Sequence, residues 1–119
     1  MNRDEAQQKL EEYRVTIDDL DRRIVDLLNA RTRVVEDIGR VKRSAELPIY
    51  EPKREDQVFD NISRASADGP LTKEAVRRIY ERIIDEMRTI QRVRMEEGGD
   101  NYIDVGQALS PANFQEALP

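Results

Sequence analysis

Apolar residues recur every three or four positions along the first third of the chain, which is the spacing of one helix face. No proline interrupts the segment from about residue 5 to about Ser44, and Gly39 is its only weak helix former. Such a helix would be about 60 Å long, whereas a compact domain of about 95 residues has a radius of gyration of about 12 Å. We therefore expect a second subunit to cover part of the apolar face. That face comprises Ile17, Leu20, Ile24, Leu27, Leu28, Val34, Val35, Ile38 and Val41.

Two shorter helical patterns follow the long one. Pro52 suits a first helical turn, and the apolar spacing after it predicts a helix that ends around Ala67. The Asp-Gly-Pro sequence at 68–70 is a break, and Thr72 is a candidate N-cap for a third helix. The patterns predict an all-α protein with three helices per chain and a very long first helix.

The helical domain is expected to span residues 1–97, because Gly98 and Gly99 end the third pattern. The remaining segment, 98–119, has no sustained hydrophobic period. Its composition favours a disordered tail, and the alternative is a tail loosely docked on the helices.

Two cations fall on the apolar face of the first helix. Arg31 and Lys42 occupy positions where the spacing predicts apolar side chains, and eleven residues, or about three turns, separate them. A buried cation is unfavourable unless an anion meets it, and either a nearby carboxylate or a small anionic ligand could serve. Glu55 extends the apolar face of the second helix, with Arg54 beside it, and Gln91 extends that of the third. Polar groups that point inward from three helices can form a ligand site.

Arg14 lies on a different side of the first helix. It precedes Arg31 by seventeen residues, which places the two side chains about 100° apart around the helix axis. One pocket in one subunit could not easily use both. A dimer could bring Arg14 to the pocket of its partner.

The composition narrows the chemistry. The chain has 119 residues, a net charge of −5, and neither His nor Cys, which excludes imidazole and thiol catalysis and the usual zinc sites. The acidic balance argues against a nucleic-acid binder. The N-terminal segment is charged rather than leader-like, and no segment is long and apolar enough to span a membrane, so we expect a cytoplasmic protein.

Three segments together carry a family resemblance over about residues 8–95. The runs LEEYRVTIDDLDRRIVDLLNARTRVVEDIGRVK, LPIYEPKRE and IIDEMRTIQ resemble the all-helical AroQ class of chorismate mutases in order and spacing. The resemblance implies an intertwined homodimer with two equivalent active sites. It also implies an isomerase that rearranges chorismate to prephenate, in phenylalanine and tyrosine biosynthesis, without a metal or a cofactor.

The resemblance also assigns roles to the inward-pointing residues. Arg14 of the neighbouring subunit would join Arg31 in holding the two carboxylates of chorismate. Lys42 and Gln91 would hydrogen-bond the ether oxygen of the breaking C–O bond, and Arg54 would add to the cationic wall.

Two acids and one apolar residue complete that assignment. Glu51 and Glu55 fall where the family holds the ring hydroxyl, although an Asp is often found at the position of Glu51. Met87 stands where a Ser can touch a substrate carboxylate, and we leave it out of the site because a thioether forms only weak hydrogen bonds.

Several alternatives stay open. Arg31 and Lys42 could pair with Glu55 in a purely structural ion network or extend past the apolar face into water. Glu51 could be only an N-cap acid before Pro52, favoured by the helix dipole. An isochorismate pyruvate lyase on the same scaffold is a second enzyme hypothesis. A third is a non-catalytic helical dimer that binds a partner enzyme of aromatic biosynthesis, and even an active mutase could have such a partner.

Overall fold

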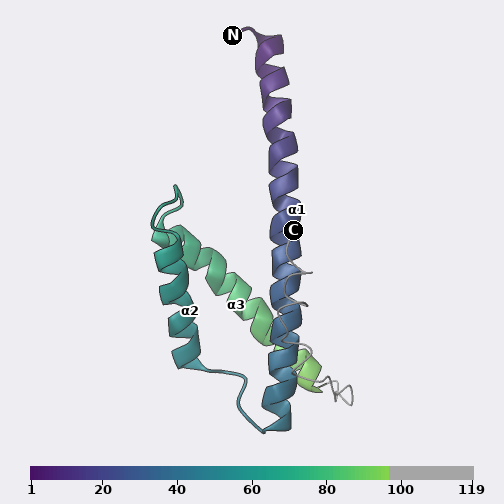
Figure 1. The fold of residues 1–119 in the computed structure, drawn as a ribbon, viewed down its shortest axis with the longest axis vertical. Coiled ribbons are helices and arrows are strands. Elements are labelled where there is room, and N and C mark those ends of the chain that lie inside the picture. The colour runs from purple at the N-terminus through teal and green to yellow at the C-terminus, as the bar shows by residue number, and fades with distance from the viewer. Residues whose placement is uncertain (97–119) are drawn as a thin grey trace.

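The computed structural model describes residues 1–96, which form three α-helices (Figure 1). Helix α1 spans Arg3–Ser44, α2 spans Pro52–Ala65 and α3 spans Lys73–Glu96. The predicted all-α architecture with a very long first helix is confirmed, and α2 ends two residues before the predicted Ala67. The tail, with Gly98 and Gly99, lies outside the described residues.

Side chains at the helix starts explain where the helices begin. The Asn2 side chain accepts a hydrogen bond from the backbone N–H of Glu5 at 2.8 Å, which caps α1. Pro52 occupies the first turn of α2, as predicted. The hydroxyl of Thr72 accepts from the N–H of Ala75 at 3.0 Å, so Thr72 is the N-cap of α3 that its sequence position indicated.

The C-terminus of α1 turns back on itself. The N–H of Leu47 donates to the carbonyl of Lys42 at 2.7 Å, and that of Glu46 donates to the carbonyl of Arg43 at 3.2 Å. This pair of bonds is a Schellman motif, in which glycine usually holds the left-handed position. Here Glu46 holds it, with φ of 56°. The turn directs the following loop back toward α1 and therefore toward Lys42.

Helix α3 packs against both α1 and α2. The buried apolar residues of the described chain come from α1 and α3: Ala30, Val35, Ile84 and Met87. The N-terminal half of α1, purple in Figure 1, extends beyond the other two helices. Its larger apolar side chains remain between 40% and 68% exposed: Leu10, Tyr13, Ile17, Leu20 and Ile24. Across residues 1–96, none of the helices carries an apolar stretch long enough to cross a membrane.

Gly39 lies where α1 and α3 approach each other closely. A Cβ at this position would lie 3.6 Å from Cγ of Gln91, which is ordinary van der Waals contact. We expect Gly39→Ala to raise the free energy of unfolding by about 0.5–1 kcal/mol, since alanine favours the helix. Gly39→Leu should lower it by about 1–3 kcal/mol, because the longer side chain must displace Gln91. Urea unfolding at matched protein concentration measures both changes, and equal losses would contradict this packing.

Candidate functional site

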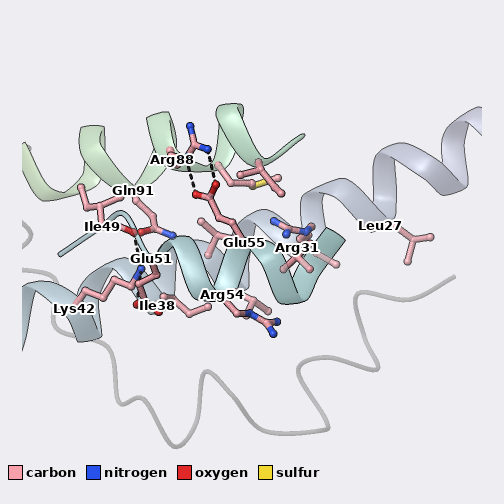
Figure 2. A pocket seen from close by; sticks show the side chains of 16 residues that line it. Leu27, Arg31, Ile38, Lys42, Ile49, Glu51, Arg54, Glu55, Arg88 and Gln91 are labelled. Carbon is pink, nitrogen blue, oxygen red and sulfur yellow. Dashed lines mark hydrogen bonds and ion pairs between the residues drawn. The ribbon is translucent and has the colours of Figure 1, made fainter. Parts of the chain in front are cut away.

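A cavity of about 600 Å³ lies between the three helices and the loop that joins α1 to α2 (Figure 2). All the site residues predicted from the sequence line this cavity except Arg14, which was predicted to act in the cavity of a partner subunit. The predicted residues that line it are Arg31, Lys42, Glu51, Arg54, Glu55 and Gln91. Three further residues of α3 also line it, Ile84, Met87 and Arg88, and the rest of the lining is apolar.

Lys42 projects from the last turn of α1 into this cavity and is 8% exposed. Its Nζ donates to the backbone carbonyl of Ile49 at 2.9 Å and lies 3.0 Å from Oε1 of Glu51 (Figure 2). An ammonium has three N–H donors, so these contacts leave one for another acceptor. Ile49 and Glu51 thus hold the ammonium in place and leave one of its three N–H donors available.

Glu51 takes the N-cap position of α2, but its side chain makes no capping hydrogen bond. Its carboxylate contacts Lys42 instead. Glu51 therefore contacts the lysine of the cavity as well as standing at the N-terminus of α2, and its contact with a substrate stays a prediction.

Glu55 of α2 forms a two-pronged ion pair with Arg88 of α3. Nε of Arg88 donates to Oε2 of Glu55 at 2.8 Å, and Nη2 donates to Oε1 at 2.7 Å (Figure 2). These hydrogen bonds hold the pKa of the Glu55 carboxyl below its ordinary value; burial opposes them, and the charges of Arg88 and Lys42 add to the lowering. The alternative in which Arg31 and Lys42 pair with Glu55 does not hold as stated within residues 1–96, because Glu55 pairs with Arg88 and Lys42 pairs with Glu51.

Arg88 was not among the residues predicted from the sequence. The signal was present, because Arg88 follows Ile84 by four positions and precedes Gln91 by three, which places it on the same helix face. An arginine on the apolar face of α3 is the same kind of anomaly as Arg31 on that of α1.

Arg31 is half-buried and makes no ion pair with any residue in 1–96. Burial lowers the pKa of its guanidinium; the nearby Tyr80 acts in the opposite direction, and the charge of Arg54 lowers the pKa further. Among residues 1–96, the hydrogen bond that the side chain of Arg54 forms is a 3.4 Å contact with Gln57. Two cations thus lie near each other at the cavity wall, and neither forms an ion pair with a carboxylate within residues 1–96, an arrangement that favours an anionic ligand.

Gln91 and Met87 line the cavity from α3. The amide oxygen of Gln91 is buried and has no hydrogen-bond partner within the described residues. A buried amide oxygen without a hydrogen-bond partner is unfavourable by about 1–3 kcal/mol, and a ligand or a water molecule that donates to it would remove that cost. The sulfur of Met87 lies 3.6 Å from the hydroxyl of Thr32, whose shorter hydrogen bond, at 2.8 Å, goes to the carbonyl of Leu28. A thioether is only a weak acceptor, so Met87 contributes a mainly apolar surface to the cavity.

Arg14 does not reach the cavity of its own chain. Seventeen residues of helix separate it from Arg31, which corresponds to about 25 Å along the axis. Its guanidinium is exposed and lies 3.8 Å from the carboxylate of Glu11.

The Glu55 pair makes stability depend on pH. A carboxyl whose pKa is lowered by folding stabilises the fold above its unfolded pKa, about 4.3 for Glu, and this stability is lost as pH falls through the lower folded pKa. We expect the free energy of urea unfolding to fall more steeply between about pH 5 and pH 3 in the wild type than in Glu55→Gln. Glu86→Gln, which removes an exposed carboxylate paired with Arg82, is the matched control. Equal slopes for wild type and Glu55→Gln would contradict the pair.

The sequence matches the family described as chorismate mutase type II over residues 13–92. The chain belongs to the chorismate mutase type II family. The match covers α2 and most of α1 and α3, and therefore every residue that lines the cavity. No solved structure gave a significant match.

Individual relatives of this chorismate mutase family are similar over the same region. The bifunctional chorismate mutase/prephenate dehydratase of Aquifex aeolicus is 35% identical over 88 residues, or 71% of this chain and 24% of that protein. The chorismate mutase of Methanocaldococcus jannaschii is 27% identical, over 76% of this chain and 91% of that protein. The 4-amino-4-deoxychorismate mutase of Streptomyces pristinaespiralis is 29% identical, over 79% of this chain and 73% of that protein. The chain thus spans about a quarter of the bifunctional relative.

Proposed function

We propose that the protein is a chorismate mutase that rearranges chorismate to prephenate. The observation that carries the proposal is the half-buried guanidinium of Arg31, which lines the cavity beside Arg54 and has no anionic partner within residues 1–96. A carboxylate of a small ligand is the anion that this pair lacks. Arginine suits it because the planar guanidinium binds a carboxylate through two parallel hydrogen bonds.

The reaction fits the residues that the cavity offers. Chorismate rearranges within one molecule: an ether C–O bond breaks, a C–C bond forms, and no atom or electron is gained or lost. The reaction needs no nucleophile and no obligatory proton transfer, so a chain without His or Cys lacks nothing. The protein must hold the compact conformer and offset the negative charge that grows on the ether oxygen.

The contacts of Lys42 and Gln91 support their proposed role at the ether oxygen. Lys42 is held by Ile49 and Glu51 but keeps one N–H donor, and Gln91 lines the same cavity with no hydrogen-bond partner for its buried amide oxygen among residues 1–96. Rotation of the amide can present its NH₂ donors instead. Donors fixed in advance stabilise developing charge because they need no reorganisation.

The carboxylates of Glu51 and Glu55 remain proposed partners of the ring hydroxyl. Each carboxylate oxygen has about two acceptor positions, and each ion pair occupies only part of them. A hydroxyl could therefore donate to Glu55 without displacing Arg88.

We propose that the active unit is a homodimer in which Arg14 completes the partner's cavity. The support is the exposed apolar surface on the N-terminal half of α1 and the distance of Arg14 from its own cavity. In the dimer, the first half of one α1 would cover the exposed stripe of the other.

Complementation tests the placement of Arg14. Arg14→Ala and Lys42→Ala homodimers should each be nearly inactive toward chorismate. A mixed dimer should regain one working cavity of two, because one of its cavities has both Arg14 and Lys42, and we expect about half of the wild-type rate per heterodimer. To measure this recovery, the two variants are mixed under conditions that dissociate the dimers, the dimers are allowed to re-form, and the rate of prephenate formation is determined. No recovery in a mixture shown to contain heterodimers would contradict the arrangement.

Product analysis tests the proposed activity against its alternatives. The purified chain is incubated separately with chorismate and with isochorismate, and products are identified by mass spectrometry. Prephenate from chorismate supports the mutase; pyruvate from isochorismate would favour the lyase. A folded protein that converts neither would favour the non-catalytic dimer. The family match and the names of the relatives favour neither alternative.

A partner enzyme of aromatic biosynthesis is a further part of the proposal. Its support is the bifunctional Aquifex aeolicus relative, whose name combines a chorismate mutase with a prephenate dehydratase. The cytoplasmic location stays a prediction.

A further inference from the structure

Both carboxylates that line the cavity are already paired with cations. Lys42 pairs with Glu51 at 3.0 Å, and Arg88 donates a hydrogen bond to each carboxylate oxygen of Glu55. The lining of one chain includes four cations and two carboxylates: Arg31, Lys42, Arg54 and Arg88 against Glu51 and Glu55. The excess of cations suits a ligand with two carboxylates, and Arg14 from a partner would increase it.

The excess of positive charge also limits which ring substituent a ligand can carry. An ammonium group on the ring would enter a cavity that already has excess positive charge, and neither carboxylate would be free to compensate it. A hydroxyl carries no charge and needs only an acceptor, which paired carboxylates still supply. Like charges brought together in a partly dry site repel each other and weaken binding.

We propose that Arg88 restricts the site to substrates whose ring substituent is a neutral hydroxyl, by occupying the carboxylate that would otherwise attract an amino group. The inference rests on the proposed function, in which Glu55 faces the ring hydroxyl of chorismate. Arg88 acts through Glu55 and is a positioning residue. No comparison with a relative assigns it this role.

The geometry around Arg88 explains why it holds Glu55 firmly. Its guanidinium lies 3.5 Å from Asp85 and 5.6 Å from the centre of the Tyr50 ring. The Arg88 side chain is 34% exposed and that of Glu55 19%, so solvent screens the pair only partly. Of the groups around Glu55, Arg88 on α3 is nearest, and Lys42 on α1 also lowers the pKa of its carboxyl.

The test compares chorismate with its analogue in which an amino group replaces the ring hydroxyl. We expect the wild type to favour chorismate in kcat/KM by about tenfold or more, and Arg88→Gln to reduce that ratio by about tenfold or more. Arg88→Lys keeps the positive charge and should keep most of the preference. Arg92→Gln, which removes an exposed arginine one turn further along α3, is the matched control and should leave the ratio unchanged.

A pH profile separates this role from a purely structural one. Without Arg88, burial raises the pKa of Glu55, so the acid limb of kcat/KM for chorismate should move to higher pH in Arg88→Gln but little in Arg88→Lys. Circular dichroism establishes that each variant is folded.

The outcomes distinguish this inference from the proposed function. If the wild type converts chorismate but Arg88→Gln keeps the wild-type ratio and acid limb, the role of Arg88 is wrong and the proposed function stands. If the folded wild type converts neither compound, both are wrong.

Discussion

Replacing Lys42 by alanine is expected to lower kcat for chorismate by about 10²- to 10³-fold, the usual loss when a fixed donor to developing charge is removed. The physical reason is the loss of the N–H that the contacts with Ile49 and Glu51 leave available. The loss should appear mainly in kcat, since the charge on the ether oxygen grows only as the C–O bond breaks. Steady-state kinetics of prephenate formation measure it.

The matched control for Lys42 is its neighbour. Arg43→Ala removes an exposed cation from the same turn of α1 and should keep near wild-type kinetics. Because Lys42 also holds the loop between α1 and α2, Lys42→Ala should lose some stability, and circular dichroism must show that its helices persist. A folded Lys42→Ala with more than about a tenth of the wild-type kcat would contradict the proposed role.

Arg31→Ala should lower kcat/KM for chorismate by about 10²- to 10³-fold, with a marked rise in KM, because a carboxylate loses its two-pronged partner. The free protein should respond differently. Arg31 has no ion pair within residues 1–96 and lies near the charge of Arg54, so its removal should leave the free energy of unfolding unchanged or higher. Kinetics and urea unfolding on the same preparation measure the two effects.

Arg33→Ala provides the comparison for Arg31. Arg33 is an exposed arginine two positions away that does not line the cavity, and its loss should change neither quantity. If Arg31→Ala instead loses stability and activity together, Arg31 has a structural partner and the anion site is wrongly placed.

The helices could be predicted from the sequence because their signals are local. The three- and four-residue spacing, Pro52 and Thr72 set the order and the starts of α2 and α3. The turn after α1 could not be predicted in the same way. Glu46 occupies the left-handed position where a glycine would have been the signal, and the path of the loop follows from that turn.

The site could be predicted in part for a similar reason. Polar residues that interrupt an apolar helix face can be recognised from their spacing alone. Four residues recognised in this way line one cavity: Arg31, Lys42, Glu55 and Gln91. Contacts between side chains of different helices, or of a helix and a loop, leave no comparable pattern in the sequence. The pairing of Glu55 with Arg88 and the contact of Lys42 with the loop depend on how helices and loop pack, which helical spacing does not encode.

Arg14 is the clearest case of information that one chain does not contain. Its position on α1 places it far from its own cavity, so its role depends on a second copy of the chain. The homodimer and the shared site therefore stay predictions.

The most direct test of the account is the time course of chorismate conversion by the purified chain in the presence of a metal chelator. We expect prephenate to form as the single product, much faster than in buffer, and the chelator to leave the rate unchanged. Chorismate consumed no faster than in buffer, by a protein that is folded and dimeric, would contradict it.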